Sequence, residues 1–118
     1  MNSASDSNSP HGLLAARLKA IADPVRLAIL YRLPDSAKDC GQLYNVSELA
    51  EEIGVSQPTI SYHLKSLKQA GLVHCRKMCR DVYYWVDHQA MTEMLSQFSD
   101  LLPSERQQGQ RSEAAGEA

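Results

Sequence analysis

Short polar side chains recur between Gly54 and Gly71, the types that hydrogen-bond base edges and phosphates. The set is Ser56, Gln57, Thr59, Ser61, Tyr62, His63, Lys65 and Ser66. Ile60, Leu64 and Leu67 repeat at helical spacing in the same segment. One helix would therefore turn its apolar face inward and the polar set outward. The pattern predicts a helix whose outer face contacts nucleic acid.

Basic residues extend beyond this helix. Between Ser56 and Val86 five cations stand against one acid, Asp81, so that the segment carries a net charge of +4. The whole chain carries −2, which leaves −6 for the remainder. The cations are Lys65, Lys68, Arg76, Lys77 and Arg80. Segregated positive charge is typical of nucleic-acid binding. On charge alone a solvated basic face is an equally good explanation. The choice between the two therefore depends on which elements carry the cations.

Cysteines offer a second kind of chemistry, at Cys40, Cys75 and Cys79. Their odd number, and an N-terminus without a secretory pattern, indicate a reducing cytoplasm rather than a disulfide framework. Thiolates bind thiophilic ions such as As(III), and a reversible disulfide is the other reaction open to them. Four residues of extended strand span roughly 13 Å, so Cys75 and Cys79 would meet only if the turn folds back. Metalloid sensing, redox sensing and no sensory role all remain open.

The elements that must position these residues fit one small domain. The chain has 118 residues, of which 43% are hydrophobic, enough for a single core. No apolar run is long enough to span a membrane. We expect a folded domain over residues 11–102, between disordered tails at 1–10 and 103–118 that offer little to bury.

Helices are predicted on both sides of a helix-turn-helix. The expected ranges are 12–22, 24–33, 48–53, 57–70 and a last helix after Asp87, with a short strand at 43–46. The expected N-caps are Asp23, Ser47, Ser56 and Asp87. Gly54 supplies the tight turn before Ser56. Because a helix-turn-helix inserts the N-terminal half of its second helix into the major groove, residues 57–61 should read bases.

Two runs of β-branched and aromatic residues, 72–76 and 82–86, predict a hairpin with a five-residue loop. Three of the cations would cluster near its tip and contact phosphates or a minor groove. These are Arg76, Lys77 and Arg80. The aromatic residues Tyr83, Tyr84 and Trp85 are expected to pack on the helices rather than stack on RNA bases. The sum is a mainly α fold with a small β-hairpin, a winged helix-turn-helix of about five helices.

Over about residues 13–98 the chain resembles the ArsR/SmtB family of winged-helix repressors. Three segments carry the resemblance, in the family's order and spacing: IADPVRLAIL, VSELAEEIGVSQPTISYHLKSLKQAGLV and RDVYYWVD. The resemblance implies a homodimer that joins through the first and last helices. It also implies a palindromic double-stranded DNA operator, released on ligand binding or thiol chemistry. Independently of the resemblance, those two helices carry apolar stripes that have to be buried against another surface, and a partner subunit would bury them. They are Leu14, Leu18 and Ile21, and Met91, Met94, Leu95 and Phe98.

Two sensor sites of the family are incomplete in this chain. Where its arsenic and cadmium sensors carry a pair of cysteines at the start of the third helix, Asn45 and Ser47 stand here. Where its zinc and nickel sensors use an Asp–His pair early in the last helix, Asp87 and His88 are present without a later His. The candidate metal ligands that remain are Cys75, Cys79 and Cys40. We expect As(III) or another thiophilic ion as inducer and no required cofactor, with a redox-responsive or ligand-independent repressor as the alternative.

Two other classes of function fit the sequence less well. An enzyme would need a signature such as Cys-x-x-Cys, His-Glu-x-x-His or a glycine-rich phosphate loop, and the sequence contains none. A winged helix used only for protein contacts would not need the +4 segment, and its binding would depend little on salt. The sequence therefore favours a DNA-binding repressor that is not an enzyme.

Overall fold

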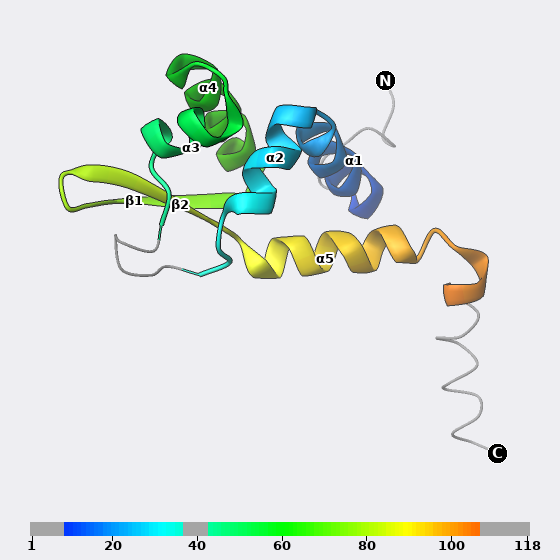
Figure 1. Ribbon diagram of the computed structural model, residues 1–118. Helices are drawn as coiled ribbons and strands as arrows, with labels where there is room; N and C mark the ends of the chain where they lie inside the picture. The colour runs from blue at the N-terminus through cyan, green and yellow to red at the C-terminus, as the bar shows by residue number, and fades with distance from the viewer. Residues whose placement is uncertain (1–8, 37–42, 107–118) are drawn as a thin grey trace.

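The computed structural model describes residues 9–36 and 43–106. The elements run in the order α1 (Pro10–Ile21), α2 (Pro24–Arg32), α3 (Val46–Ile53), α4 (Gln57–Gln69), β1 (Val73–Met78), β2 (Asp81–Val86) and α5 (His88–Ser99) (Figure 1). A further helical turn covers 103–106. The predicted mainly α fold with one hairpin is confirmed. Cys40 and most of the two expected tails lie outside the described residues.

Local sequence signals begin and end the helices largely as predicted. Asp23, Ser56 and Asp87 each accept a backbone N–H from the first turn of α2, α4 and α5. Gly54 ends α3 with φ at 86°, a left-handed conformation that costs glycine little. The tight turn of the helix-turn-helix is therefore present where the sequence placed it. Within the described ranges, no helix combines the length and the apolar character that a membrane crossing requires.

The start of α3 differs from the prediction of a Ser47 cap after a strand. Asn45 is the N-cap: its Oδ1 accepts from the Glu48 amide at 2.8 Å, and Glu48 Oε1 accepts from the Asn45 amide at 3.0 Å. This capping box satisfies two backbone donors, whereas a serine hydroxyl would satisfy one. Of the expected strand at 43–46 only the bridge between Tyr44 and Tyr84 forms.

The hairpin turn is shorter than predicted. β1 and β2 pair antiparallel over all six residues of each strand, so the turn consists of Cys79 and Arg80 alone. Their φ angles are 53° and 72°, a left-handed geometry that matches the twist of the strands in a two-residue hairpin. Asn-Gly is the usual signal for such a turn. Because Cys-Arg does not resemble it, the sequence pattern pointed to a longer loop.

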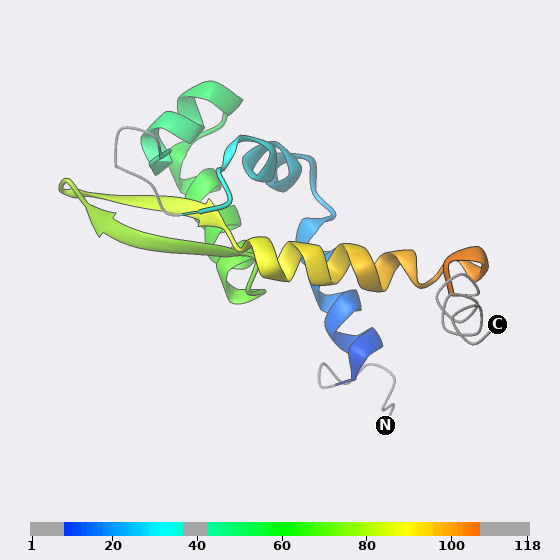
Figure 2. The ribbon, with the colours of Figure 1, turned by 90° about the horizontal axis from the view of Figure 1, so that it is seen from below.

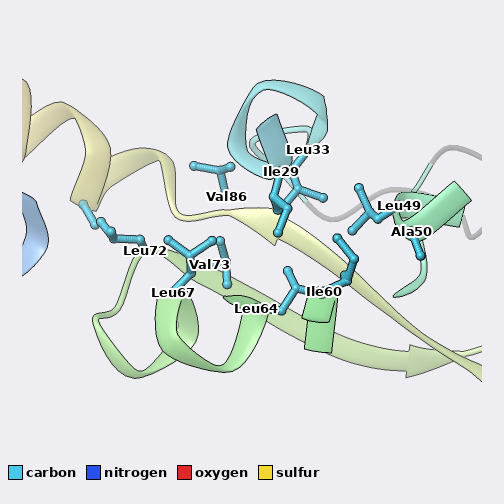
Figure 3. Close-up of a cluster of buried hydrophobic side chains, with 11 residues drawn as sticks. Ile29, Leu33, Leu49, Ala50, Ile60, Leu64, Leu67, Leu72, Val73 and Val86 are labelled. Carbon is cyan, nitrogen blue, oxygen red and sulfur yellow. The ribbon is translucent and has the colours of Figure 1, made fainter. Parts of the chain in front are cut away.

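The core lies where α2, α3 and α4 meet the base of the hairpin (Figure 3). The large side chains that are at most 1% exposed are Ile29, Leu49, Ile60, Leu64, Leu67, Leu72 and Val73. Three of these come from α4, and they confirm its predicted inner face. Each such burial is worth about 1.5–3 kcal/mol relative to exposure. The core therefore fixes the position of α4 more firmly than any single surface contact does.

Figures 1 and 2 show the hairpin tip and the second half of α5 projecting from this core in opposite directions. Arg17 of α1 pairs with Glu93 of α5, with Nη1 and Oε1 at 3.2 Å. Leu14 and Met94 are buried, so the apolar stripes of α1 and α5 are partly covered within one chain. Side chains that are 49–63% exposed continue the α5 stripe. They are Leu95, Phe98, Leu101 and Leu102.

Candidate nucleic-acid interface

Helix α4 exposes a polar face in its N-terminal half and beyond. Gln57, Ser61, Tyr62 and Lys65 are all exposed, and 57, 61 and 65 share one helix face by their spacing of four. The other face is locked into the core. At 13 residues, the helix is about 20 Å long, enough to lie in a major groove. These four residues of the predicted DNA-contacting set are therefore on the surface of the protein.

Ser56 and Thr59 have a local role at the start of α4. Their hydroxyl oxygens lie 2.8 Å apart, and the Thr59 amide donates to Ser56 Oγ at 3.3 Å. Thr59 is half-buried, whereas Ser56 is exposed. Both residues were predicted to contact DNA. Because they hydrogen-bond each other, their main role in the structure is to begin the helix.

His63 is not on the outer face, contrary to the prediction. It is 9% exposed, and its Nδ1 accepts a hydrogen bond from Arg26 Nε at 2.9 Å. Arg26 also donates to the Ala20 carbonyl at 3.0 Å and lies over the Tyr62 ring, 5.7 Å from its centroid. Helical spacing puts His63 at the border of the polar face, and packing against α2 turns it inward. His63 therefore positions α4 on α2, with Asp23 Oδ1 3.9 Å from its Nε2.

The hairpin, which we call the wing (residues 73–86), carries its cations along its outer half. Arg76, Lys77 and Arg80 are exposed. Only Arg80 lies in the turn; neighbouring strand residues point to opposite faces, so Arg76 and Lys77 do not form one cluster with it. The Arg76 guanidinium lies 5.6 Å from the centre of the Trp85 ring, a cation–π contact. Positive charge is thus spread over both faces of the wing.

Of the aromatic residues of β2, Tyr84 packs against the core, as predicted, whereas Trp85 contacts His74 and Arg76 of the neighbouring strand β1. Tyr83 is 9% exposed, while Tyr84 and Trp85 are half-buried. Burial raises the pKa of Tyr84, and the neighbouring Cys75 raises it further. Trp85 is flanked by His74, with ring centroids 5.8 Å apart. This packing leaves little open ring surface for base stacking.

Two polar contacts that the sequence did not predict attach the wing to the helices. At its base, His74 Nε2 and Asp87 Oδ2 are 2.7 Å apart. Nearer its tip, Asn45 Nδ2 donates to Asp81 Oδ2 at 2.7 Å. The spacing of Asn45 and Glu48 is that of a capping box, a signal that would have found the cap. No sequence signal pairs Asn45 with Asp81, 36 residues away.

Two carboxylates that cap helices, Asp87 and Asp23, have lowered pKa values. A hydrogen bond from the Ala90 amide lowers the pKa of Asp87, against the effect of burial, and His74 lowers it further. Burial acts to raise the pKa of Asp23, but hydrogen bonds from the amides of Arg26 and Val25 outweigh it, so the net shift is downward. Each carboxylate is thus favoured in the charged form that caps its helix.

The cysteines are not assembled into one site within the described residues. Cys75 is half-buried and free, opposite Tyr84 in the ladder. Cys79 lies in the turn and is disulfide-bonded. Since β1 is regular strand between them, their Cα atoms are separated by roughly 13 Å. In the described ranges, no three His, Cys, Asp or Glu side chains form a group that could hold a metal ion; Cys40 lies outside those ranges.

The incomplete Asp–His pair of the last helix is engaged in structural contacts. Asp87 caps α5 and contacts His74. His88 is on the surface, with its side chain 71% exposed and its Nδ1 3.1 Å from Asp35 Oδ2. These contacts agree with the interpretation of Asp87 as an N-cap and of His88 as a first-turn surface residue.

Comparison with known proteins identifies relatives of the chain. Residues 23–74 match the model of the bacterial regulatory protein, arsR family. The chain is 35% identical over 83 residues to an uncharacterized HTH-type transcriptional regulator of Methanocaldococcus jannaschii, covering 70% of this chain and 88% of that protein. It is 36% identical over 89 residues to the arsenical resistance operon repressor of Staphylococcus xylosus, covering 75% and 79%. A 43% identical match to the repressor SmtB of Mycobacterium tuberculosis spans 57% of this chain but only 45% of that protein.

Solved structures share the same architecture. NolR from Sinorhizobium fredii matches with a TM-score of 0.59 and 30% identity, covering 76% of this chain and 84% of that one. Reduced HlyU from Vibrio cholerae matches with a TM-score of 0.62 and 28% identity, covering 84% and 98%. The three relatives compared by sequence are transcription regulators or repressors rather than enzymes. The chain therefore belongs to the ArsR/SmtB family of winged helix-turn-helix transcription regulators.

Proposed function

We propose that this protein is a homodimeric repressor of the cytoplasm that binds a palindromic double-stranded DNA operator through α4 and the wing. We further propose that it releases the operator when its thiols bind a thiophilic metalloid such as As(III). One observation supports DNA binding above all. Helix α4 is locked into the core by three fully buried side chains while its polar N-terminal half stays exposed. That arrangement presents a rigid reading surface to a groove.

Dimer formation is supported by the exposed apolar end of α5. Leu95 is 63% and Phe98 53% exposed, and a contiguous apolar surface of this kind marks an interface. A two-fold dimer would place its two α4 helices on half-sites about 34 Å apart. We expect Phe98→Asp to give a monomer by sedimentation and to lose most operator affinity. A Phe98→Asp variant that still sediments as a dimer would contradict an interface on α5.

DNA binding is tested by fluorescence anisotropy over a salt series. Affinity should fall steeply, with a log–log slope of about −0.9 for each phosphate neutralised. Lys65→Ala and Arg76→Ala should weaken binding to every duplex, because they contact phosphates. Gln57→Ala and Ser61→Ala should instead change sequence preference, by about 1–3 kcal/mol for each base that is no longer read.

Lys19→Ala is the matched control, since Lys19 is an exposed cation on α1, outside both α4 and the wing. It should leave affinity and slope unchanged. Equal losses for all four interface variants on every sequence would refute α4 as the reading helix. Binding that does not respond to salt would favour a winged helix used for protein contacts.

Thiol sensing is supported by the position of two cysteines in the wing. Cys75 is a free, half-buried thiol next to Arg76. Cys79 is next to Arg80 in the turn; it is disulfide-bonded in the structure and would bind an ion only after reduction. A ligand that reshapes this hairpin would re-aim the cations that hold DNA. A coupling of about 1–3 kcal/mol would release DNA roughly 5–150-fold. Because the strand holds Cys75 and Cys79 apart, one ion would reach both only with a refolded wing end, or would take Cys40 as a ligand.

The inducer is tested by titrating arsenite into the preformed protein–DNA complex, with salt and a non-thiol reductant held fixed. We expect release at micromolar arsenite. The Cys75→Ser/Cys79→Ser variant should bind DNA normally and ignore arsenite. Release of DNA from that double variant would show that the wing thiols are not the sensor.

A second candidate, thiol-redox sensing, is favoured by the disulfide-bonded state of Cys79. Two thiols would lose two electrons and two protons to an oxidant such as hydrogen peroxide, forming one S–S bond. Peroxide without metalloid would then change operator affinity, and a reductant would restore it. Cys79→Ser should abolish that response. If operator affinity responds to arsenite and not to peroxide, redox sensing is excluded and metalloid sensing is the candidate that remains.

A further inference from the structure

Asn45 uses both ends of its side-chain amide to join two elements. Its Oδ1 accepts from the Glu48 amide at 2.8 Å and caps α3. Its Nδ2 donates to Asp81 Oδ2 at 2.7 Å, at the first residue of β2. The other oxygen of Asp81 accepts from the Val82 amide at 3.0 Å. One side chain thus connects the helix-turn-helix to the outer end of the wing.

The neighbouring residue extends this connection to α2. Tyr44 forms a backbone bridge with Tyr84 in the wing, and its hydroxyl donates to Glu52 Oε2 at 2.8 Å. Arg32 of α2 donates from Nε to Glu52 Oε1 at 2.9 Å. The Tyr44 hydroxyl and the Arg32 guanidinium lower the pKa of Glu52, so the acceptor stays charged. A polar chain therefore runs from the wing through residues 44–45 to α3 and α2.

The type of residue at 81 is unexpected for a DNA-contacting wing. Asp81 is the one acid between Ser56 and Val86, and it follows Arg80 directly. A carboxylate at this place repels phosphates and so opposes DNA binding. Its oxygens bind the neutral N–H donors of Asn45 and Val82. The charge thus serves position rather than contact with DNA.

We infer that Asn45 and Asp81 form a clamp that sets the angle of the wing relative to α4, so that both are positioning residues for operator binding. This inference rests on the proposed DNA binding by α4 and the wing. The base of the wing enters the core through Val73 and Val86, with Tyr84 packed against it, and the tip projects away from the helices (Figure 1). A two-stranded hairpin is marginally stable by itself. Without the clamp, the cations of the outer half would lose their alignment with α4.

The test uses two single substitutions in the full chain, Asp81→Ala and Asn45→Ser. Serine remains a good N-cap, so Asn45→Ser removes the clamp and keeps α3. Each variant should raise the operator Kd by about three- to tenfold, the range expected for an exposed charge-assisted hydrogen bond. For Asp81→Ala this is opposite to the effect of charge alone, since removing an acid should tighten binding.

Four further results separate positioning from general damage. The double variant should bind no more weakly than either single variant, because both substitutions remove the same hydrogen bond. The salt slope should shrink by about one phosphate contact, while the base preference set by α4 stays as in the wild type. Asp81→Asn, which keeps an acceptor oxygen for Asn45 and loses the charge, should bind at least as tightly as the wild type.

Hydrogen exchange of the β1 and β2 amides should be faster in Asp81→Ala and Asn45→Ser than in the wild type. Wild-type binding or tighter binding by Asp81→Ala, or unchanged exchange in the wing, would overturn the clamp. A wild-type protein that binds no DNA would instead overturn the proposed function. The two failures are therefore distinguishable.

Discussion

Helix α4 and the wing are both expected to contact DNA, yet different forces hold them. Ile60, Leu64 and Leu67 of α4 are completely buried, and His63 adds a hydrogen bond from α2. The outer half of the wing buries one large side chain, Tyr83, and is otherwise joined to the helices by exposed polar contacts such as Asn45–Asp81. Burial contributes more free energy than exposed hydrogen bonds do. The reading helix is thus rigidly placed, and the wing is the part that a small free energy can move.

This difference bears on what the two cysteines of the wing could do. Cys75 and Cys79 lie in the adjustable element rather than in α4. An inducer bound to α4 would have to work against the core, whereas one bound to the wing would work against a few exposed contacts. Allosteric couplings of about 1–3 kcal/mol are enough for the second. Four sets of measurements test whether α4 is held more firmly than the wing.

The largest effect is expected from the core side of α4. Leu64→Ala should lower the free energy of unfolding by about 2–5 kcal/mol, because burial is reduced and a cavity is left behind. Val82→Ala, at a half-buried position of the wing, should cost less than about 1.5 kcal/mol. Urea unfolding of both variants measures the two changes in the free energy of unfolding. Equal destabilisation by the two substitutions would mean that the wing is as tightly integrated as α4.

The joint between α2 and α4 should rank second. Arg26→Ala leaves the half-enclosed Nδ1 of His63 without its donor and should cost about 1–3 kcal/mol. His63→Ala should cost a similar amount, and the double variant less than the sum, because the two side chains interact directly. Unfolding free energies of the three variants give the coupling. Strict additivity would show that this hydrogen bond does not hold α4 in place.

The two turns should respond in opposite directions. Gly54→Ala should destabilise by about 1–2 kcal/mol, and strain alone is the cause since a Cβ there meets nothing within 4 Å. Arg80→Gly should stabilise the hairpin by up to about 1 kcal/mol, because φ of 72° suits glycine. The same change should weaken DNA binding by removing a cation. Thermal unfolding and anisotropy check both; a destabilising Arg80→Gly would show that the turn is not strained.

Acid should have the smallest effect. The folded pKa of Asp87 lies below its usual value, chiefly through the Ala90 amide and then His74. Its contribution is therefore fully present above an unfolded pKa of about 3.9 and is lost as pH falls through the folded value. Asp87→Asn still caps α5 but should flatten this part of the pH dependence of unfolding. An unchanged profile between about pH 5 and pH 2 would assign the acid sensitivity to other groups, Asp23 among them.

Much of the fold followed from local patterns. Asp23, Ser56 and Asp87 cap helices because their side chains reach amides two or three residues on, and Gly54 turns the chain because it lacks a Cβ. The inner face of α4 followed from the helical period of about 3.6 residues. The predicted Ser47 cap and five-residue wing loop were wrong because both depend on which of several local options the surrounding structure favours.

The sequence pattern could not predict contacts between residues that are far apart in the chain. His63 stands at the edge of the polar face of α4, and only α2, with Arg26, turns it inward. Asn45 and Asp81 meet because the wing folds back beside the start of α3. The sequence was sufficient to predict the helices and three of their four expected N-caps, since these depend on neighbours within a few residues. The tertiary structure alone decided the Arg26–His63 joint and the clamp on the wing, because such pairs join side chains 36 or 37 residues apart.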